Sequence, residues 1–235
     1  MKKLLIVKAG ETFPAVKEIW GDFEDFIITQ IGLDKKDIYV TSAYEEEPLP
    51  PLRDISGMII TGSHTNVTQH EAWCVKLSED VKEVAHKGIP ILGICYGHQL
   101  IVQAFGGQVN YHPRGIEIGT VDIELTVDGM DDPLLGVLPK QFLGQVTHEQ
   151  TALLLPNGAK VLAHNDFEPH HAFALGETIW GIQFHPEFNA DIMHRYIDEQ
   201  AEKLLQKNQD IDLLHDYVRE SDYGKQLLER FIDLL

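Results

Sequence analysis

Apolar residues in the first hundred positions form short runs that alternate with segments of helical periodicity. The runs are rich in β-branched side chains and are bounded by chain-breaking or charged residues, which is typical of buried strands. Between the last two runs, residues 72–87 place apolar side chains at helical spacing and predict a helix with one buried face. Strands that alternate with helices indicate βαβ units and a parallel sheet. The predicted strands are Leu4–Val7, Ile38–Thr41, Gly57–Thr61 and Pro90–Ile94.

The second half of the chain predicts further strands followed by helices. Residues 117–127 alternate over part of their length, as a half-exposed strand does. A helix is expected to begin at Asn189, and residues 210–235 repeat its pattern in one or two more helices. Shorter strands are expected near 160–164, 171–175 and 178–184.

Composition and charge define the class of molecule. Apolar residues make up 43% of the 235 residues, enough for a large core, and no linker or internal repeat interrupts them. We therefore predict one α/β domain over residues 1–200 and a C-terminal helical extension, 201–235, packed on it.

The formal net charge of −18 repels phosphate backbones and anionic membranes, so no nucleic acid or membrane is expected as a partner. Cys74 and Cys95 lack CxxC or metal-like spacing, which favours a reducing, cytoplasmic compartment.

The strongest local signal for chemistry surrounds Cys95. This residue lies on a predicted turn between a buried strand and an apolar helix, and Gly93 and Gly97 flank it. The pattern is the G-x-nucleophile-x-G elbow with Cys in place of Ser. Glycines there allow a strained backbone and close neighbours, and the helix N-terminus favours the thiolate form of the sulfur. The amide of Tyr96 is then directed to where an oxyanion would develop.

A second signal supplies the expected base. A thiol nucleophile needs a base, and that base needs an orienting carboxylate. His185 closes a strand-like run, and Glu187 follows two positions later, past a proline. Side chains two apart on an extended segment point the same way, so Glu187 can support the imidazole. The alternatives are an inert buried cysteine and a surface His-Pro-Glu turn, but finding both motifs in one chain favours catalysis.

These motifs resemble those of a known family. The segments GICYGHQ around Cys95 and GIQFHPEF around His185 resemble class I (triad-type) glutamine amidotransferases, especially stand-alone proteins similar to the glutaminase domain of GMP synthase. The resemblance covers about residues 1–200. It includes Gly57–His64, where the family has a glycine-rich oxyanion strand, and Val146–His148, where it has a substrate-side His motif.

The resemblance implies a fold and a set of roles. The fold is flavodoxin-like, an open and mostly parallel sheet with helices on both faces. Cys95 is expected to attack the side-chain carboxamide of glutamine, while His185 moves the proton and Glu187 holds the imidazole. The remaining roles implied are an oxyanion hole made by the amides of Ser63 and Tyr96, and substrate binding by Gly62, Gln99, His148 and Glu149.

The sequence departs from the GMP synthase pattern at three positions. GMP synthases usually have a second glycine where Ser63 stands and a proline where His64 stands, and a backbone amide can still donate from Ser63. They also follow the substrate-side His with glycine, whereas Glu149 follows His148 here. This additional carboxylate either repels the α-carboxylate of glutamine or recognises its α-amino group.

The resemblance predicts a glutaminase without a cofactor. The chain carries no GxxxxGK[ST] or GxGxxG motif, and its histidine clusters at 64–71 and 164–171 lack metal-ligand spacing, so neither a nucleotide cofactor nor a metal is expected. We expect hydrolysis of glutamine through a Cys thioester, with the ammonia passed to an acceptor on a separate synthase partner. One alternative is a γ-glutamyl hydrolase or peptidase. The other is a non-catalytic regulatory module with the same fold.

Overall fold

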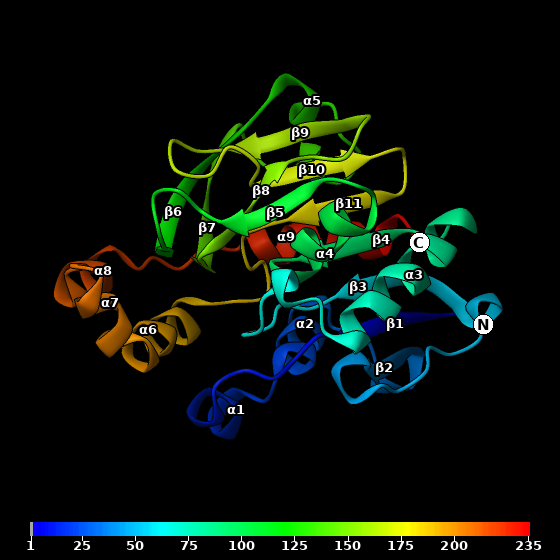
Figure 1. Ribbon diagram of the computed structural model, residues 1–235, viewed down its shortest axis with the longest axis horizontal. Coiled ribbons are helices and arrows are strands. Elements are labelled where there is room, and N and C mark those ends of the chain that lie inside the picture. The colour runs from blue at the N-terminus through cyan, green and yellow to red at the C-terminus, as the bar shows by residue number, and fades with distance from the viewer. Residues whose placement is uncertain (1) are drawn as a thin grey trace.

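The computed structural model describes residues 2–235, which form one large sheet with helices on both of its faces (Figure 1). Within these residues, nine strands join in the order β2-β1-β3-β4-β11-β10-β9-β6-β7, and two more form an antiparallel pair, β5-β8. Seven of the nine strands run in one direction, because only β10 and β6 are antiparallel to both neighbours. The strands are β1 (Lys3–Lys8), β2 (Ile38–Ser42), β3 (Ile55–Ile60), β4 (Ile91–Ile94), β5 (Gln108–Tyr111), β6 (Glu117–Leu125), β7 (Gln141–His148), β8 (Gln150–Leu154), β9 (Ala159–His164), β10 (Ala172–Leu175) and β11 (Ile179–Ile182).

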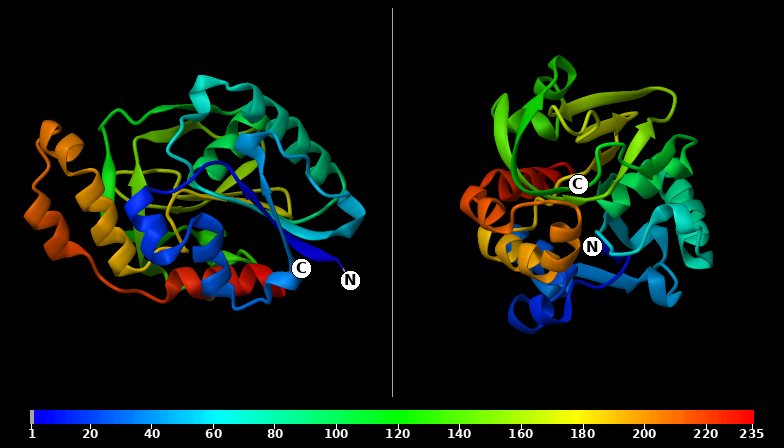
Figure 2. Two further views of the ribbon diagram at one scale, coloured as in Figure 1. Left: turned by 90° about the horizontal axis from the view of Figure 1, so that it is seen from below. Right: turned by 60° about the vertical axis from the view of Figure 1, so that its left-hand side comes forward.

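Helices cover both faces of the sheet (Figure 2), which confirms the predicted open, mostly parallel α/β architecture. Helices α3 and α4 pack on one face, and α2 and α9 lie together on the other. Helices α6, α7 and α8 form a group beyond one end of the sheet. The helices are α1 (Pro14–Trp20), α2 (Phe23–Ile31), α3 (Ala72–His86), α4 (Tyr96–Ala104), α5 (Val127–Met130), α6 (Ala190–Glu199), α7 (Ala201–Gln206), α8 (Ile211–Tyr217) and α9 (Tyr223–Asp233).

The apolar run of β1 shows why its pattern is continuous rather than alternating. Leu4 and Ile6 belong to the core under α2 and α9, whereas Leu5 and Val7 belong to the core under α3 and α4. Successive side chains of a strand point to opposite faces, so a strand that is covered on both faces must be apolar at every position.

Parallel strands bring the site together at one edge of the sheet. The carboxyl ends of β1, β3, β4, β11 and β7 all lie at this edge, because these strands run in the same direction. In such sheets the ligand binds outside the carboxyl ends of the strands. The candidate residues that follow β3, β4 and β11 in the sequence are therefore neighbours in space.

Some elements differ from the sequence predictions. Residues 117–127 are confirmed as a strand, but its partner β7 and the pair β5-β8 were not predicted, because their apolar residues follow no regular alternation. Within the C-terminal extension, α9 is an integral part of the core, since Leu227, Leu228 and Phe231 are fully buried. The division of the chain at residue 200 stays a prediction. Among residues 2–235, no helix combines the length and apolar character needed to cross a bilayer.

Two glycines allow the backbones of β3, β4 and α4 to approach closely. A Cβ atom on Gly93 would lie 2.4 Å from the carbonyl oxygen of Gly97, and one on Gly97 would lie 2.6 Å from the carbonyl oxygen of Ile60. These neighbours are backbone atoms, which cannot rotate away.

We expect Gly93→Ala to lower the free energy of unfolding by about 1–3 kcal/mol, measured by urea denaturation. An unchanged midpoint would contradict this packing.

Candidate active site

Cys95 occupies a strained turn between β4 and α4. Its φ of 50° and ψ of −95° lie in a region that non-glycine residues rarely adopt. A hydrogen bond of 2.8 Å from the Cys95 amide to the carbonyl of Ile182, at the end of β11, holds the turn in place. The strained conformation places the thiol at the first turn of α4, at the carboxyl edge of the sheet.

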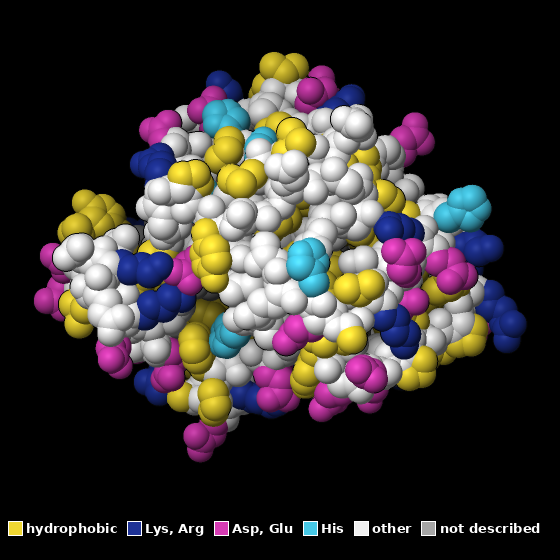
Figure 3. All heavy atoms as spheres, viewed as in Figure 1, with side chains coloured by type: hydrophobic (Ala, Val, Ile, Leu, Met, Phe, Trp, Pro, Cys, Tyr) yellow, Lys and Arg dark blue, Asp and Glu magenta, His cyan; other side chains and the backbone are white. Residues whose placement is uncertain are grey.

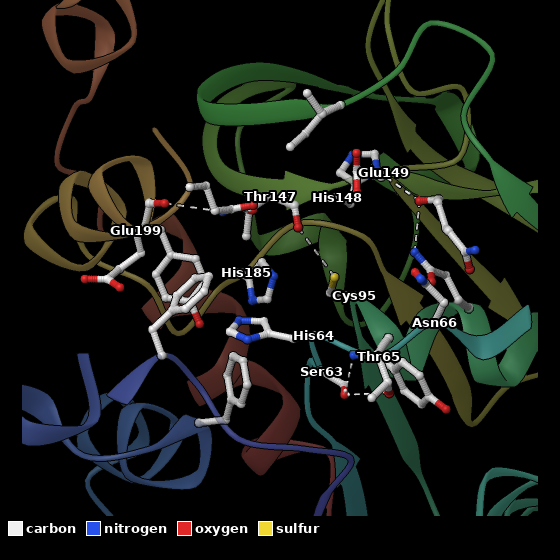
Figure 4. Close-up of a pocket in the computed structure, with 18 of the residues that line it drawn as sticks. Ser63, His64, Thr65, Asn66, Cys95, Thr147, His148, Glu149, His185 and Glu199 are labelled. Atoms are coloured by element: carbon white, nitrogen blue, oxygen red, sulfur yellow. Dashed lines mark hydrogen bonds between the residues drawn. The ribbon is translucent and has the colours of Figure 1, made fainter. Parts of the chain in front are cut away.

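His185 and Glu187 lie together at the end of β11. Nδ1 of His185 is 2.8 Å from Oε1 of Glu187, and both side chains are almost fully buried. The ring of His185 stacks on Phe188 at 4.2 Å between centroids, and a hydrogen bond from the His185 amide to the carbonyl of Gln145 (2.8 Å) fixes its backbone. The imidazole therefore has little freedom to rotate, and Figure 4 shows it beside Cys95.

The charge state of His185 is set by two neighbours. Burial alone would lower the pKa of the imidazole, but the charge of Glu187 and the neighbouring Cys95 outweigh it and raise the pKa to about 10. The ring of His185 is therefore protonated at neutral pH. A protonated imidazole in the cavity that Cys95 lines can act as a proton donor.

Backbone amides next to the thiol are available for an oxyanion. The amides of Ser63 and Tyr96 donate no hydrogen bond within the described residues, and both residues line the same cavity as Cys95. Gly62 is not among the residues that line the cavity, and its role in binding substrate stays a prediction. A Cβ atom there would lie 2.9 Å from Cε1 of His185, so Gly62 makes room for the imidazole of His185.

The thiol opens into a cavity of about 310 Å³ between the sheet edge and helices α6 and α7. Seven of the nine residues predicted for the site line this cavity, and Glu187 lies behind His185. Figure 4 shows the lining side chains around Cys95. The predicted residues that line it are Ser63, Cys95, Tyr96, Gln99, His148, Glu149 and His185.

His148 belongs to a buried polar network as well as to the cavity wall. Its Nε2 is 2.9 Å from Oε2 of Glu117, and its Nδ1 is 3.1 Å from the carbonyl oxygen of Gln150. Burial alone would lower the pKa of His148, but the hydrogen bond to Glu117 and its charge raise it above the ordinary value. Glu117 also accepts a hydrogen bond of 2.8 Å from Asn165. Glu117 was not predicted, because it is adjacent to His148 only through the pairing of β6 with β7.

Gln99 and Glu149 are held by neighbours of their own. The amide of Gln99 donates to the carbonyl of Gln150 at 2.9 Å and to Oε1 of Gln183 at 3.0 Å, so this side chain supports the cavity wall. Glu149 accepts hydrogen bonds from Lys203 of α7 and from Lys207 of the turn that follows it. Burial alone would raise the pKa of Glu149, but these two lysines outweigh it and lower the pKa.

An aromatic wall closes the side of the cavity next to His185. The ring of His64 lies 4.1 Å from that of Phe13 and 5.9 Å from that of Tyr196, measured between centroids. Burial and the charge of His185 lower the pKa of His64 to about 4, so it is neutral at physiological pH. None of these wall residues was predicted, because they come from three segments that no local pattern connects. Within residues 2–235, no cluster of three or more metal-ligating side chains is arranged to hold an ion.

Comparison with known proteins defines the family. A sequence model described as "Glutamine amidotransferase class-I" matches residues 28–203. The chain is 27% identical over 209 residues to γ-glutamyl peptidase 4 of Arabidopsis thaliana, covering 84% of this chain and 80% of the relative. It is 36% identical over 152 residues to the glutamine-hydrolysing GMP synthase of Gloeothece citriformis, covering 63% of this chain but only 25% of that protein.

A solved structure of a glutamine amidotransferase from Thermotoga maritima has the same fold, with a TM-score of 0.79, 22% identity, and coverage of 100% of this chain and 98% of that one. Because the family match spans most of the sequence, the chain belongs to the class I glutamine amidotransferase family. The two curated relatives are hydrolytic enzymes. Their names give different substrates, γ-glutamyl peptides for one and glutamine for the other.

The two cysteines should differ sharply in reactivity. Cys95 lines the cavity, whereas Cys74 is buried in the core under α3, where burial raises the pKa of its thiol. We expect iodoacetamide at neutral pH to modify Cys95 at least about tenfold faster than Cys74, as mapped by mass spectrometry of peptides. A Cys74→Ala variant should keep the labelling rate at Cys95. Preferential labelling of Cys74 would contradict the assignment of the nucleophile.

Glu187→Gln should weaken catalysis and shift its pH range. The amide keeps a hydrogen-bond acceptor for Nδ1 of His185 but removes the charge that raises the pKa of that ring. We expect kcat/KM to fall by on the order of a hundredfold. The alkaline loss of activity, which follows deprotonation of His185, should move to lower pH. Inactivity equal to that of Cys95→Ala, or an unmoved alkaline limb, would count against this role for Glu187.

Proposed function

We propose that the chain is a glutaminase that hydrolyses the side-chain amide of glutamine and passes the ammonia to an acceptor on a separate protein. The observation that carries the proposal is the geometry of Cys95, held at φ 50° beside a His185 whose Nδ1 is 2.8 Å from Glu187. A thiol and an imidazole that line one cavity, with a carboxylate behind the imidazole to orient it, are the components of acyl transfer through a covalent intermediate.

The proposed reaction has two steps. The Cys95 thiolate attacks the amide carbon, and the amides of Ser63 and Tyr96 stabilise the oxyanion that forms. When the tetrahedral intermediate collapses, its C–N bond breaks and His185 gives its proton to the departing nitrogen, which is released as ammonia. The acyl group remains bound to Cys95 as a thioester. His185 then removes a proton from water, which attacks the thioester, and glutamate leaves as the thiol is restored.

A second candidate is hydrolysis of γ-glutamyl peptides. The leaving amine must lie near His185, which protonates it, and on that side the cavity continues along Phe13, His64 and Tyr196. This space can hold an amine larger than ammonia. The name of the Arabidopsis thaliana relatives, γ-glutamyl peptidases, supports the same alternative.

A separate synthase partner belongs to the glutaminase proposal alone. The chain covers 25% of the length of the GMP synthase from Gloeothece citriformis. In the glutaminase proposal the released ammonia reacts at an acceptor site on another protein. A γ-glutamyl peptidase needs only water and no partner.

The two candidates can be separated by comparing kcat/KM for glutamine and for γ-glutamyl dipeptides, with glutamate release measured for the purified chain. Glutamine as the better substrate, with low turnover, supports the glutaminase proposal. A preference for dipeptides of about tenfold, equal to about 1.4 kcal/mol of transition-state binding, would overturn it. Cys95→Ala is the inactive control and Cys74→Ala the matched active one. No release from either substrate by a folded chain would favour the non-catalytic module.

A further inference from the structure

A charged trio lies at the rim of the cavity, where the C-terminal helices meet the end of β7. Lys203 and Lys207 of α7 and the turn after it both donate to Glu149, one to each carboxylate oxygen. Lys203 and Glu149 also line the cavity. A hydrogen bond of 3.0 Å from the amide of Gln200 to the hydroxyl of Thr147 fixes the start of α7 against the same strand end. These hydrogen bonds hold the three side chains of the trio in fixed positions at the cavity wall.

The charge of this trio is unusual for the molecule. The whole chain carries a formal charge of −18, yet two ammonium groups against one carboxylate leave this rim with an excess positive charge. Figure 3 shows dark blue side chains over α7, next to a hollow in this face. The charge of Lys203 also contributes to the lowered pKa of His64, which places the ammonium group within electrostatic range of the cavity interior.

Lys203 differs from the histidines of the cavity wall, because His185 is engaged by Glu187 and His148 by Glu117. It is the one lysine or arginine among the residues of the described chain that line the cavity. The other lining carboxylate, Glu199, is engaged by Arg195 at 2.8 Å. Lys203 has three donors and uses one of them on Glu149, so it can bind a second anion without leaving the first.

We propose that Lys203 binds the α-carboxylate of the substrate and that Glu149 binds its α-ammonium group, while Lys207 keeps Glu149 ionised and oriented. A γ-glutamyl compound carries these two opposite charges on one carbon atom, and Lys203 and Glu149 present two opposite charges side by side. This inference rests on the proposed hydrolysis of a γ-glutamyl amide. It defines the substrate class as γ-glutamyl compounds with a free α-amino acid end.

The first test measures alkylation of Cys95, which needs no turnover. The chloroketone analogue of glutamine carries the α-amino acid end, whereas iodoacetamide carries no charge. We expect the wild-type chain to react faster with the chloroketone. Lys203→Met should lower the chloroketone rate about tenfold and leave the iodoacetamide rate within about twofold. Lys82→Met is the matched control, because Lys82 pairs with Glu79 on α3 outside the cavity.

The second test measures selectivity during hydrolysis. Glutaramate is glutamine without the α-amino group, and γ-aminobutyramide is glutamine without the α-carboxylate. Lys203→Met should lose the preference for glutamine over γ-aminobutyramide and keep the preference over glutaramate. Glu149→Gln should show the opposite pattern. The two patterns of selectivity thus show which substrate group, the α-carboxylate or the α-ammonium group, binds to Lys203 and which binds to Glu149.

The outcomes separate this inference from the proposed function. Suppose that Cys95 reacts faster with the chloroketone than with iodoacetamide, that this depends on Lys203, and that no substrate is hydrolysed. This result would support the binding of the α-amino acid end and overturn the proposed hydrolytic function. Hydrolysis of glutamine with selectivity unchanged in Lys203→Met would overturn the binding role alone. A defect of Lys203→Met confined to γ-glutamyl dipeptides, with chloroketone alkylation unchanged, would also overturn it, since Lys203 would then bind the carboxylate of the leaving amino acid.

Discussion

The site depends on a backbone constraint at the end of β4. Cys95 is held at a positive φ, which costs on the order of 1–3 kcal/mol for a non-glycine residue. The close packing of β3, β4 and α4 offsets this cost, because Gly93 and Gly97 let the backbones touch. The amide of Cys95 is also bonded to the end of β11, the strand that leads to His185. One turn thus fixes the thiol of Cys95 relative to the ring of His185.

Two neighbouring histidines show how this site controls charge by environment. His185 and His64 are both buried, yet the pKa of the first is raised to about 10 and that of the second is lowered to about 4. The difference arises because His185 faces the carboxylate of Glu187, while His64 faces aromatic rings and the charge of His185 itself. Groups whose surroundings separate their pKa values in this way can take different roles in one reaction.

The sequence predicted the parts of the fold and site that local patterns encode. The buried strands, α3, and the positions of Cys95 and His185 after strands β4 and β11 follow from runs and motifs a few residues long. The wall of the cavity could not be predicted in this way. Glu117 reaches His148 only through strand pairing, and Lys203 reaches Glu149 only through the docking of α7. Such contacts depend on tertiary packing, for which a single sequence gives no periodic signal.

The order of strands in the sheet has a consequence for synthesis of the chain. β4 lies in the middle of the sheet, but its neighbour β11 is made much later than β3, on its other side. While the chain grows, β4 therefore forms an open and wholly apolar edge, a kind of edge that favours association between chains. The same late strand supplies the carbonyl that fixes the turn at Cys95. The backbone of Cys95 therefore gains this hydrogen bond only when β11 pairs with β4, so the same step covers the apolar edge and fixes the turn that carries the thiol.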